Sequence, residues 1–432
     1  MKKFLYSVFM LAVVVLTACS NDDNGDTQPK RGMTLNASVE DLSSRATMTD
    51  ESGTWKFAFA ANDQVSVSNS KITNYYTFTN NGSQFTCAQA EVTKEAADWY
   101  AYFPGNEVDL TNQTGNFADV ANKFAVAGGT ALATTGEKGL SITLKPKVAV
   151  LRVVAVDKKG ILDIHVKTAD KWVKGLIATK DATDFTVSTS DTKTTLLHKA
   201  EGTVNAGEIN YVVVPAGVKI AIYNGDLLLN TTKVGLTAGK YYTITSGPTK
   251  GKTNALINGQ ETPVEWVQLW AGGPRFAIQN VAEEMTWTDA ANTGKEYVWG
   301  ENWRTPTAAE VTEEGGLQAE WNTKEGKWVV KEGSPTINVT TKDGIEETVE
   351  FTGVQPGYTK NTLTLYNKID SHGYSHFNFW TTTENNGYGC MYRIMIDKGI
   401  IGIFGPSSFE SKDTKCLVRP VLSIQNITNN KK

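Results

Sequence analysis

The sequence has few cysteines, few histidines and little net charge. Its 432 residues include four cysteines and four histidines, and 42 basic against 46 acidic residues leave a formal charge of -4. So weak a charge excludes the electrostatic field with which proteins bind nucleic acid or an anionic membrane. Long hydrophobic runs are missing as well. The apolar stretch from Phe4 to Leu16 is shorter than the roughly 20 residues that span a bilayer as a helix.

Common catalytic patterns are also absent. The sequence contains no GxSxG nucleophile elbow, and its carboxylates are too scattered to nominate an acid/base pair. His372 and His376 are near each other in the chain, but a zinc site would need a third ligand that the sequence does not supply. We therefore expect a protein that is not an enzyme and that uses no metal or other cofactor.

The first 19 residues have the form of a bacterial lipoprotein signal. Lys2 and Lys3 form a basic head before the apolar run, which is too short to be a transmembrane helix. The string "LTAC" that ends at Cys19 resembles the lipobox, in which the cysteine is acylated and becomes the new N-terminus. Residues 1–18 are thus interpreted as a signal peptide and Cys19 as the lipidation site. An ordinary secretory peptide with an incidental cysteine is the alternative.

The segment after Cys19 predicts a tether followed by a strand. The acidic "NDDN" resembles the export tag of lipoproteins that reach the outer face of the outer membrane in Bacteroidetes-type bacteria. Polar residues continue to Gly32 and predict a disordered tether. Leu35, Ala37 and Val39 then alternate with polar residues, which is the period of a strand. Residues 19–45 are interpreted as the tether and a removable first strand, with Arg45 at its end.

The next 200 residues predict a mainly β fold. Short strand-like runs are separated by turn pairs such as Asn81-Gly82 and Asn224-Gly225, without helical periodicity. At roughly 100 residues per sandwich, this length predicts two tandem β-sandwich domains of the transthyretin-like, Greek-key type. We place them at residues 46–140 and 141–248, with the boundary after the Gly/Ala/Thr-rich run "AVAGGTALATTGEKG". Cys87, close to Phe85 in a strand-like run, is predicted to be a buried small hydrophobe.

Four strings in this region resemble those of the fimbrillin-like pilins of Bacteroidales: "ANDQVSVS", "WYAYFPG", "LKPKVAVLRVVAV" and "YVVVPAG", behind a lipobox. The resemblance implies export as a lipoprotein and cleavage by an Arg-specific protease near the start of the first sandwich. The cut removes the first strand, and a donor strand from a neighbouring subunit fills the groove. Arg45 is in the matching place, and Arg31 is a weaker second candidate. An ordinary arginine in an exposed linker is the alternative for Arg45.

The C-terminal part has a different composition. Residues 249–263 are rich in Gly, Thr and Lys and are interpreted as a linker. Beyond Val264 lie eight of the 11 tryptophans, and a Thr307-x-x-Glu310 capping box predicts a short helix. The strings "VQLWAGGPRFAIQNV", "YVWG", "NWRTPTAAEV", "FTGV", "FWTTTEN" and "LVRPV" resemble the Fibrobacter succinogenes major paralogous domain. That resemblance implies an α+β fold similar to C-type lectins over residues 264–425.

A lectin-like domain implies binding rather than catalysis. Cys390 and Cys416 are too far apart in sequence for the cysteine pair of the related formylglycine-generating enzymes, but they could form a disulfide. No EPN, QPD or WND string is present, so calcium is doubtful. Most tryptophans, among them Trp299, Trp303 and Trp380, are expected in the core. The residues chosen as ligand contacts are Tyr374, His376, Asn385, Asn386 and Tyr388.

The prediction is a surface fimbrial subunit, a tip or ancillary pilin, that is routed through the outer membrane by its lipid and mediates adhesion. A stalk pilin ends in its own donor strand, whereas here the C-terminal position holds a globular module. Expected partners are other pilin subunits and a glycan or protein ligand on host or bacterial surfaces, but not nucleic acid. The rival interpretation is a surface lipoprotein that binds glycans without polymerising.

Overall fold

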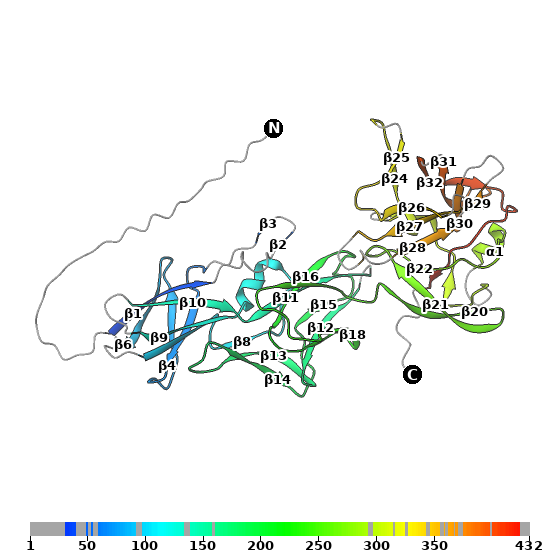
Figure 1. Ribbon diagram of the computed structural model, residues 1–432. Coiled ribbons are helices and arrows are strands. Elements are labelled where there is room, and N and C mark those ends of the chain that lie inside the picture. Colours follow the sequence, from blue (N-terminus) through cyan, green and yellow to red (C-terminus); the bar gives the residue numbers. More distant parts are fainter. Residues whose placement is uncertain are drawn as a thin grey trace, which may run out of the picture.

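The computed structural model is mainly β, and its chain forms three successive units, which Figure 1 shows from the blue N-terminal strands to the red C-terminal ones. It describes residues 31–39, 49–50, 53–54, 59–91, 97–133, 139–157, 160–292, 297–313, 316–324, 327–342, 346–354, 358, 362–366, 368–369, 375–397 and 400–423. Cys19, Arg45 and Tyr374 lie outside these ranges. Within them, every helix is too short or too polar to cross a lipid bilayer.

The first unit is a closed barrel of seven strands in the order β1-β10-β9-β7-β4-β5-β6. Its strands are β1 (Arg31–Val39), β4 (Gln64–Asn69), β5 (Tyr76–Asn80), β6 (Phe85–Glu91), β7 (Ala97–Phe103), β9 (Val126–Ala133) and β10 (Leu140–Pro146). The short strands β2 (Thr49–Asp50) and β3 (Gly53–Thr54) pair only with each other among the described strands. We predicted a β-sandwich that this first strand completes. The structure has a closed barrel, because β1 pairs with both β6 and β10.

The predicted boundary at residue 140 does not separate the first two units. The Gly/Ala/Thr-rich run that suggested it contains strand β9, and β10, which starts at Leu140, belongs to the barrel. Glycine is required at Gly128 for packing rather than for a linker. A Cβ atom there would lie 2.1 Å from the carbonyl oxygen of Thr143 in β10, so only a glycine lets the two strands approach so closely.

The second unit consists of two sheets. One has the order β16-β11-β19, and the other has the order β14-β13-β12-β17-β18, with β15 added on β12 and β8 added on β13. The strands are β8 (Glu107–Asp109), β11 (Val148–Val154), β12 (Leu162–Thr168), β13 (Lys171–Ala178), β14 (Phe185–Ser190), β15 (Leu197–Lys199), β16 (Ile209–Pro215), β17 (Ala221–Asn224), β18 (Leu227–Thr231) and β19 (Tyr241–Thr245). The 3₁₀ helix η2 (Phe117–Lys123) packs on β16.

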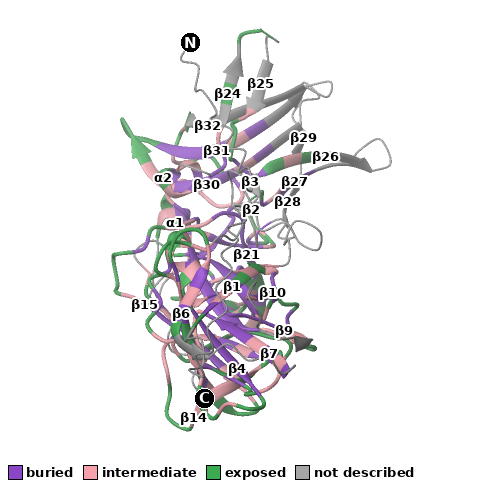
Figure 2. Ribbon diagram, turned by 90° about the vertical axis from the view of Figure 1, so that its left-hand side faces the viewer, coloured by how far each residue is buried: buried purple, intermediate pink, exposed green. Residues whose placement is uncertain are grey.

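The barrel and the second unit share one hydrophobic core. A single cluster of buried side chains runs from Met33 and Leu35 through β11 to Ile222. Figure 2 shows buried residues along the barrel strands β1, β4, β7 and β10. Between the units, the hydroxyl oxygen of Tyr102 lies 2.9 Å and 2.7 Å from the carbonyl oxygens of Thr179 and Ala182. The two N-terminal units are therefore packed as one body.

The third unit begins with a hairpin where we predicted a linker. Strands β20 (Lys250–Ile257) and β21 (Gln260–Gln268) pair along their length. Asn258 and Gly259 have positive φ angles of 52° and 77°, as a tight type I′ turn requires. The linker interpretation was wrong because a polar composition also fits a hairpin with one exposed face, and every second residue of β20 is exposed.

The rest of the third unit combines small sheets with two short helices, α1 (Trp287–Ala291) and α2 (Ala308–Thr312). Strands β20 and β21 continue into β22 (Arg275–Ala277), β33 (Val421–Leu422) and β23 (Trp303–Arg304). The other strands are β24 (Ala319–Asn322), β25 (Lys327–Val330), β26 (Thr336–Lys342), β27 (Glu346–Thr352), β28 (Thr362–Tyr366), β29 (Lys368–Ile369), β30 (Ser375–Asn385), β31 (Tyr388–Asp397) and β32 (Ile400–Glu410).

Two predictions for this unit are confirmed. Thr307 and Glu310 form the predicted capping box at the start of α2. Trp299, Trp303 and Trp380 are buried in one core cluster. The unit is joined to the second one by polar and apolar contacts: Arg275 Nη2 lies 2.9 Å from Asp157 Oδ1, and Tyr358 shares a buried cluster with Val154 and Val156.

Candidate functional site

The candidate site is the place that β1 occupies in the barrel. On one side β1 pairs antiparallel with β6, with Met33 opposite Cys87 and Leu35 opposite Phe85. On the other side it pairs parallel with β10, from Leu35 opposite Leu140 to Val39 opposite Leu144. The alternation predicted from the sequence is thus that of a strand that completes a sheet from both sides.

The inward side chains of β1 belong to the core. Met33 and Leu35 are 2% and 0% exposed, and Ala37 and Val39 are partly buried against the same cluster. Asn36 and Ser38 are exposed. Full burial of a large aliphatic side chain contributes about 1.5–3 kcal/mol relative to exposure, so Met33 and Leu35 alone contribute several kcal/mol to the closed ring.

The floor and walls under β1 come from its two neighbours. The buried apolar residues there are Phe85 and Cys87 of β6 and Leu140, Ile142 and Leu144 of β10. Burial of Cys87 confirms the prediction that it acts as a small hydrophobe. Removal of β1 would expose this apolar surface together with the paired backbone edges of β6 and β10.

One glycine marks the closest approach of β1 to the chain that enters β10. Gly139 has a φ of +71°, and a Cβ atom there would lie 2.5 Å from the carbonyl oxygen of Thr34. Both the positive φ and the lack of space require glycine. The fit of β1 thus depends on a residue more than 100 positions away in the chain.

The contacts of β1 do not depend on a particular sequence. Backbone pairing and apolar burial hold it, and Ser38 Oγ lies within hydrogen-bond distance of Thr143 Oγ1, at 3.3 Å. Another strand with the same alternation of apolar and polar residues can reproduce pairing and burial. The arrangement is therefore chemically suited to the exchange of one strand for another.

The two candidate arginines have different positions relative to β1. Arg31 is the first residue of β1, so a cut after it would leave the strand attached to the barrel. Arg45 lies outside the described residues, in the chain that follows β1. Every other described strand comes after Arg45, and a cut there would leave β1 held by noncovalent contacts alone.

The residues chosen as ligand contacts in the third unit do not converge. Asn385, Asn386 and Tyr388 lie together at the turn between β30 and β31, where the side chain of Tyr388 is 52% exposed. His376 lies near the other end of β30, paired with Lys368. At a rise of about 3.3 Å per residue the two ends are roughly 30 Å apart. One small ligand cannot reach both, so the structure does not bring the described residues of the predicted set together.

Side chains that the sequence did not single out lie beside this turn. Lys412 Nζ is 2.8 Å from Glu384 Oε2 and 4.6 Å from the centre of the Trp287 ring. The Trp287 indole donates a hydrogen bond to the carbonyl oxygen of Thr381. These residues come from three separate segments of the chain. Sequence spacing gave no signal that they meet.

Cys390 and Cys416 are not joined in a disulfide, and both are buried. Cys416 belongs to the core cluster that also contains Met391, the neighbour of Cys390 in β31. Burial raises the pKa of the Cys390 thiol. Within the described residues, no group of His, Cys, Asp and Glu side chains gathers in a way that could hold a metal ion.

No protein-family model and no curated protein matches the sequence. Among solved structures, a "putative cell adhesion protein" from Bacteroides ovatus has a TM-score of 0.32 and 10% identity over 55% of this chain and 96% of its own. One of the same description from Bacteroides uniformis has a TM-score of 0.30 and 15% identity, covering 50% and 93%. A fimbrial protein from Bacteroides ovatus has a TM-score of 0.25 and 13% identity, covering 91% and 100%. Similarity at this level does not define a function for the chain.

Proposed function

We propose that the chain is a surface fimbrial subunit that assembles by exchange of β1 for a strand of another subunit. One observation carries the proposal: β1 closes the barrel between β6 and β10, and Arg45 separates it from every later strand. A cut at Arg45 makes this strand replaceable. The groove that it leaves has two backbone edges and an apolar floor, which is what an incoming extended strand needs.

Closure by β1 before the cut serves a purpose in this scheme. An open edge beside an apolar groove would pair with any extended chain during export and aggregate. The strand within the same chain blocks that edge until the protease acts. Strand exchange then replaces the contacts of β1 by contacts of the same kind with another subunit. These new contacts offset the free energy that removal of β1 costs.

The two ends of the chain have separate roles in the proposal. Lipidation at Cys19 brings the subunit to the cell surface through the outer membrane, and cleavage at Arg45 releases it from the lipid. The third unit mediates adhesion from a tip or ancillary position. Its fold is proposed to be C-type-lectin-like. The role of the whole protein is mechanical and adhesive rather than catalytic.

Cleavage tests the proposal directly. The full chain is incubated with an Arg-specific protease, and the new N-terminus is sequenced. We expect Ala46, and we expect the cut chain to form detergent-resistant complexes when other pilin subunits are added. The Arg45→Ala variant should stay monomeric, whereas Arg31→Ala, as the matched control, should be cut and assemble like the wild type.

The opposite result would favour the rival function. If Arg45→Ala reaches the surface and assembles as well as the wild type, strand exchange after this cut is not the mechanism. The adhesive role has its own test on arrays of glycans and host proteins, probed with the full chain and with Tyr388→Ala at the exposed turn of the third unit. Binding that Tyr388→Ala weakens would place the ligand at that turn.

A further inference from the structure

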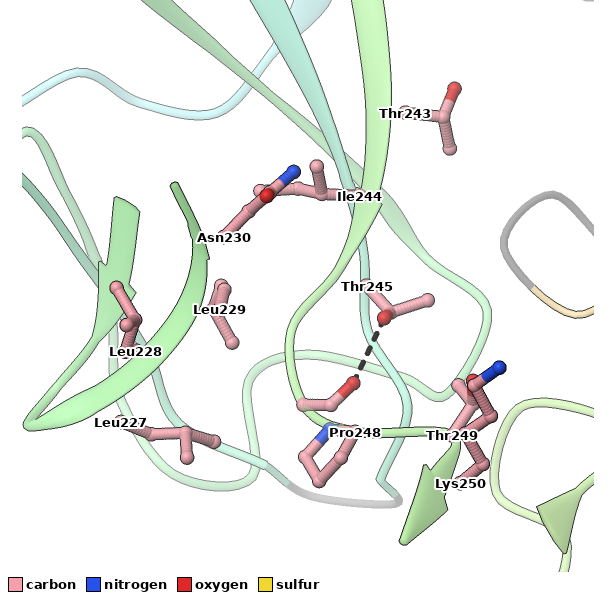
Figure 3. Close-up of a pocket in the computed structure, with 11 residues that line it drawn as sticks. Leu227, Leu228, Leu229, Asn230, Thr243, Ile244, Thr245, Pro248, Thr249 and Lys250 are labelled. Carbon is pink, nitrogen blue, oxygen red and sulfur yellow. Dashed lines mark hydrogen bonds between the residues drawn. The ribbon is translucent and has the colours of Figure 1, made fainter. Parts of the chain in front are cut away.

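The second unit has a groove between the edges of its two sheets. Figure 3 shows this cavity of about 350 Å³, with β18 on one side and β19 on the other. Its lining consists of Leu227, Leu228, Leu229, Asn230, Thr243, Ile244, Thr245, Gly247, Pro248, Thr249 and Lys250. Strand β18 ends one sheet and β19 ends the other, and among the described strands neither has a partner on the side of the groove.

The two edge strands of the groove run in opposite directions, as do β6 and β10 on the two sides of β1. In Figure 3, β18 and β19 run in opposite directions, with Leu227 and Pro248 at the same end of the groove. A strand placed between them antiparallel to β18 is therefore parallel to β19. This is the relation of β1 to β6 and β10 in the barrel.

The groove exposes apolar side chains. Leu227 and Leu228 are 47% and 51% exposed, although they belong to a strand. Unpaired edge strands in soluble proteins are usually protected by charges, proline or a covering segment. Two half-exposed leucines at such an edge provide surface that another strand would bury.

The charge of the groove indicates the chemistry of its occupant. Lys250 is the one charged residue in the lining, and its side chain is exposed. It lies at the end toward which β19 runs. An occupant parallel to β19 therefore brings its C-terminal end to Lys250, where a carboxylate is favoured.

We propose that this groove is a second strand-acceptor site, and that its occupant is the segment 33–41 of a second copy of this chain. That segment carries alternating apolar residues, from Met33 to Val39, followed directly by Glu40 and Asp41. Placed parallel to β19, it buries leucines of β18 and brings its two acids to Lys250. The proposal rests on the proposed function only in that β1 must first leave its own barrel.

A peptide binding assay tests the groove without any cleavage. The probe is the synthetic peptide MTLNASVED with an N-terminal fluorophore, titrated against the full chain and followed by fluorescence anisotropy. Leu228→Lys should weaken binding at least about tenfold, because it removes apolar burial from the contact. Val234→Lys is the matched control: Val234 is 73% exposed in the same unit but outside the groove, and binding should not change. Circular dichroism checks that both variants fold.

Charge reversal tests the direction of the bound strand. Lys250→Glu should weaken binding of the same peptide about fivefold, the upper range for an exposed ion pair. A peptide ending in two lysines in place of the acids should recover that loss on Lys250→Glu and bind the wild type more weakly. No binding to the wild type, or equal binding to Leu228→Lys and Val234→Lys, overturns the proposal. Equal binding would place the peptide outside the groove and leave the proposed function intact.

Discussion

The barrel and the second unit are built alike around their central strands and differ in how they close. In the barrel, β10 has β9 antiparallel on one side and β1 parallel on the other. In the second unit, β11 has β16 antiparallel and β19 parallel. The parallel neighbour of the barrel goes on to pair with β6, whereas β19 has no second partner among the described strands.

This difference shows what closure requires. The closing strand of the barrel precedes all other described strands, and it pairs on both sides. Strand β19 is followed within five residues by β20, and its chain leads into the third unit. The barrel is therefore closed by its first strand, while the second unit has an open edge at β19 among the described strands.

The largest difference in stability is expected between two leucine-to-alanine substitutions, one in β1 and one in β18. Leu35→Ala removes a fully buried side chain from β1 and should destabilise the barrel by about 3 kcal/mol. Leu228→Ala at the open edge should change stability by no more than about 0.5 kcal/mol, since that side chain is half-exposed. Hydrogen exchange of the amides of β10 measures the opening of the barrel.

Hydrogen exchange also distinguishes a local role of β1 in closing the barrel from a general contribution to packing in both units. If β1 closes the barrel, Leu35→Ala should increase exchange in β6 and β10 more than in β11, since β11 is not its neighbour. Uniform loss of protection across both units would contradict a local role for β1. Leu228→Ala should leave all three strands protected.

A smaller effect is expected from the glycine under β1. Gly139→Ala places a methyl group against the backbone of Thr34 at a positive φ, and it should cost about 2 kcal/mol. Gly202→Ala is a matched control, because Gly202 has a φ of +79° but nothing within 4 Å of the added Cβ. Urea denaturation of the two variants compares the costs. Equal losses would mean that backbone strain alone, and not contact with β1, requires the glycine.

The sequence predicted β1 but not its surroundings. Alternation at Leu35, Ala37 and Val39 is local information, and the structure has a strand there. Pairing with β10 joins residues about 105 positions apart, and no periodicity encodes such a distance. Ile142 of β10 and Phe85 of β6 were therefore predicted as strand residues, but not as neighbours of β1.

In the third unit, amino-acid composition and closeness in sequence led to wrong predictions of local structure. The pair Asn258-Gly259 is a strong signal for a two-residue hairpin, yet the polar residues around it suggested a linker. In the third unit, His376 and Asn385 are close in sequence but lie at opposite ends of one extended strand. Closeness in sequence indicates closeness in space within a turn, but not along a strand.

The smallest predicted effect concerns acid and the second unit. Burial acts to raise the pKa of Asp163, but hydrogen bonds and charge from His165 and His198 outweigh it, and the pKa is lowered from its ordinary value of 3.8. A lowered pKa stabilises the fold above the ordinary value, and this contribution is lost as the pH falls through the lowered pKa. We therefore expect the second unit to lose stability below about pH 4, in which range Asp163 becomes protonated.

Asp163→Asn isolates this contribution. The amide cannot carry the charge that the two histidines contact, so the variant should be less stable than the wild type by about 1 kcal/mol at pH 7. At pH 3 the difference should shrink, because the wild-type carboxylate is then partly protonated. Urea denaturation at the two pH values measures both differences. A deficit of equal size at both pH values would show that the shape of the side chain, and not its charge, is what the second unit requires at this position.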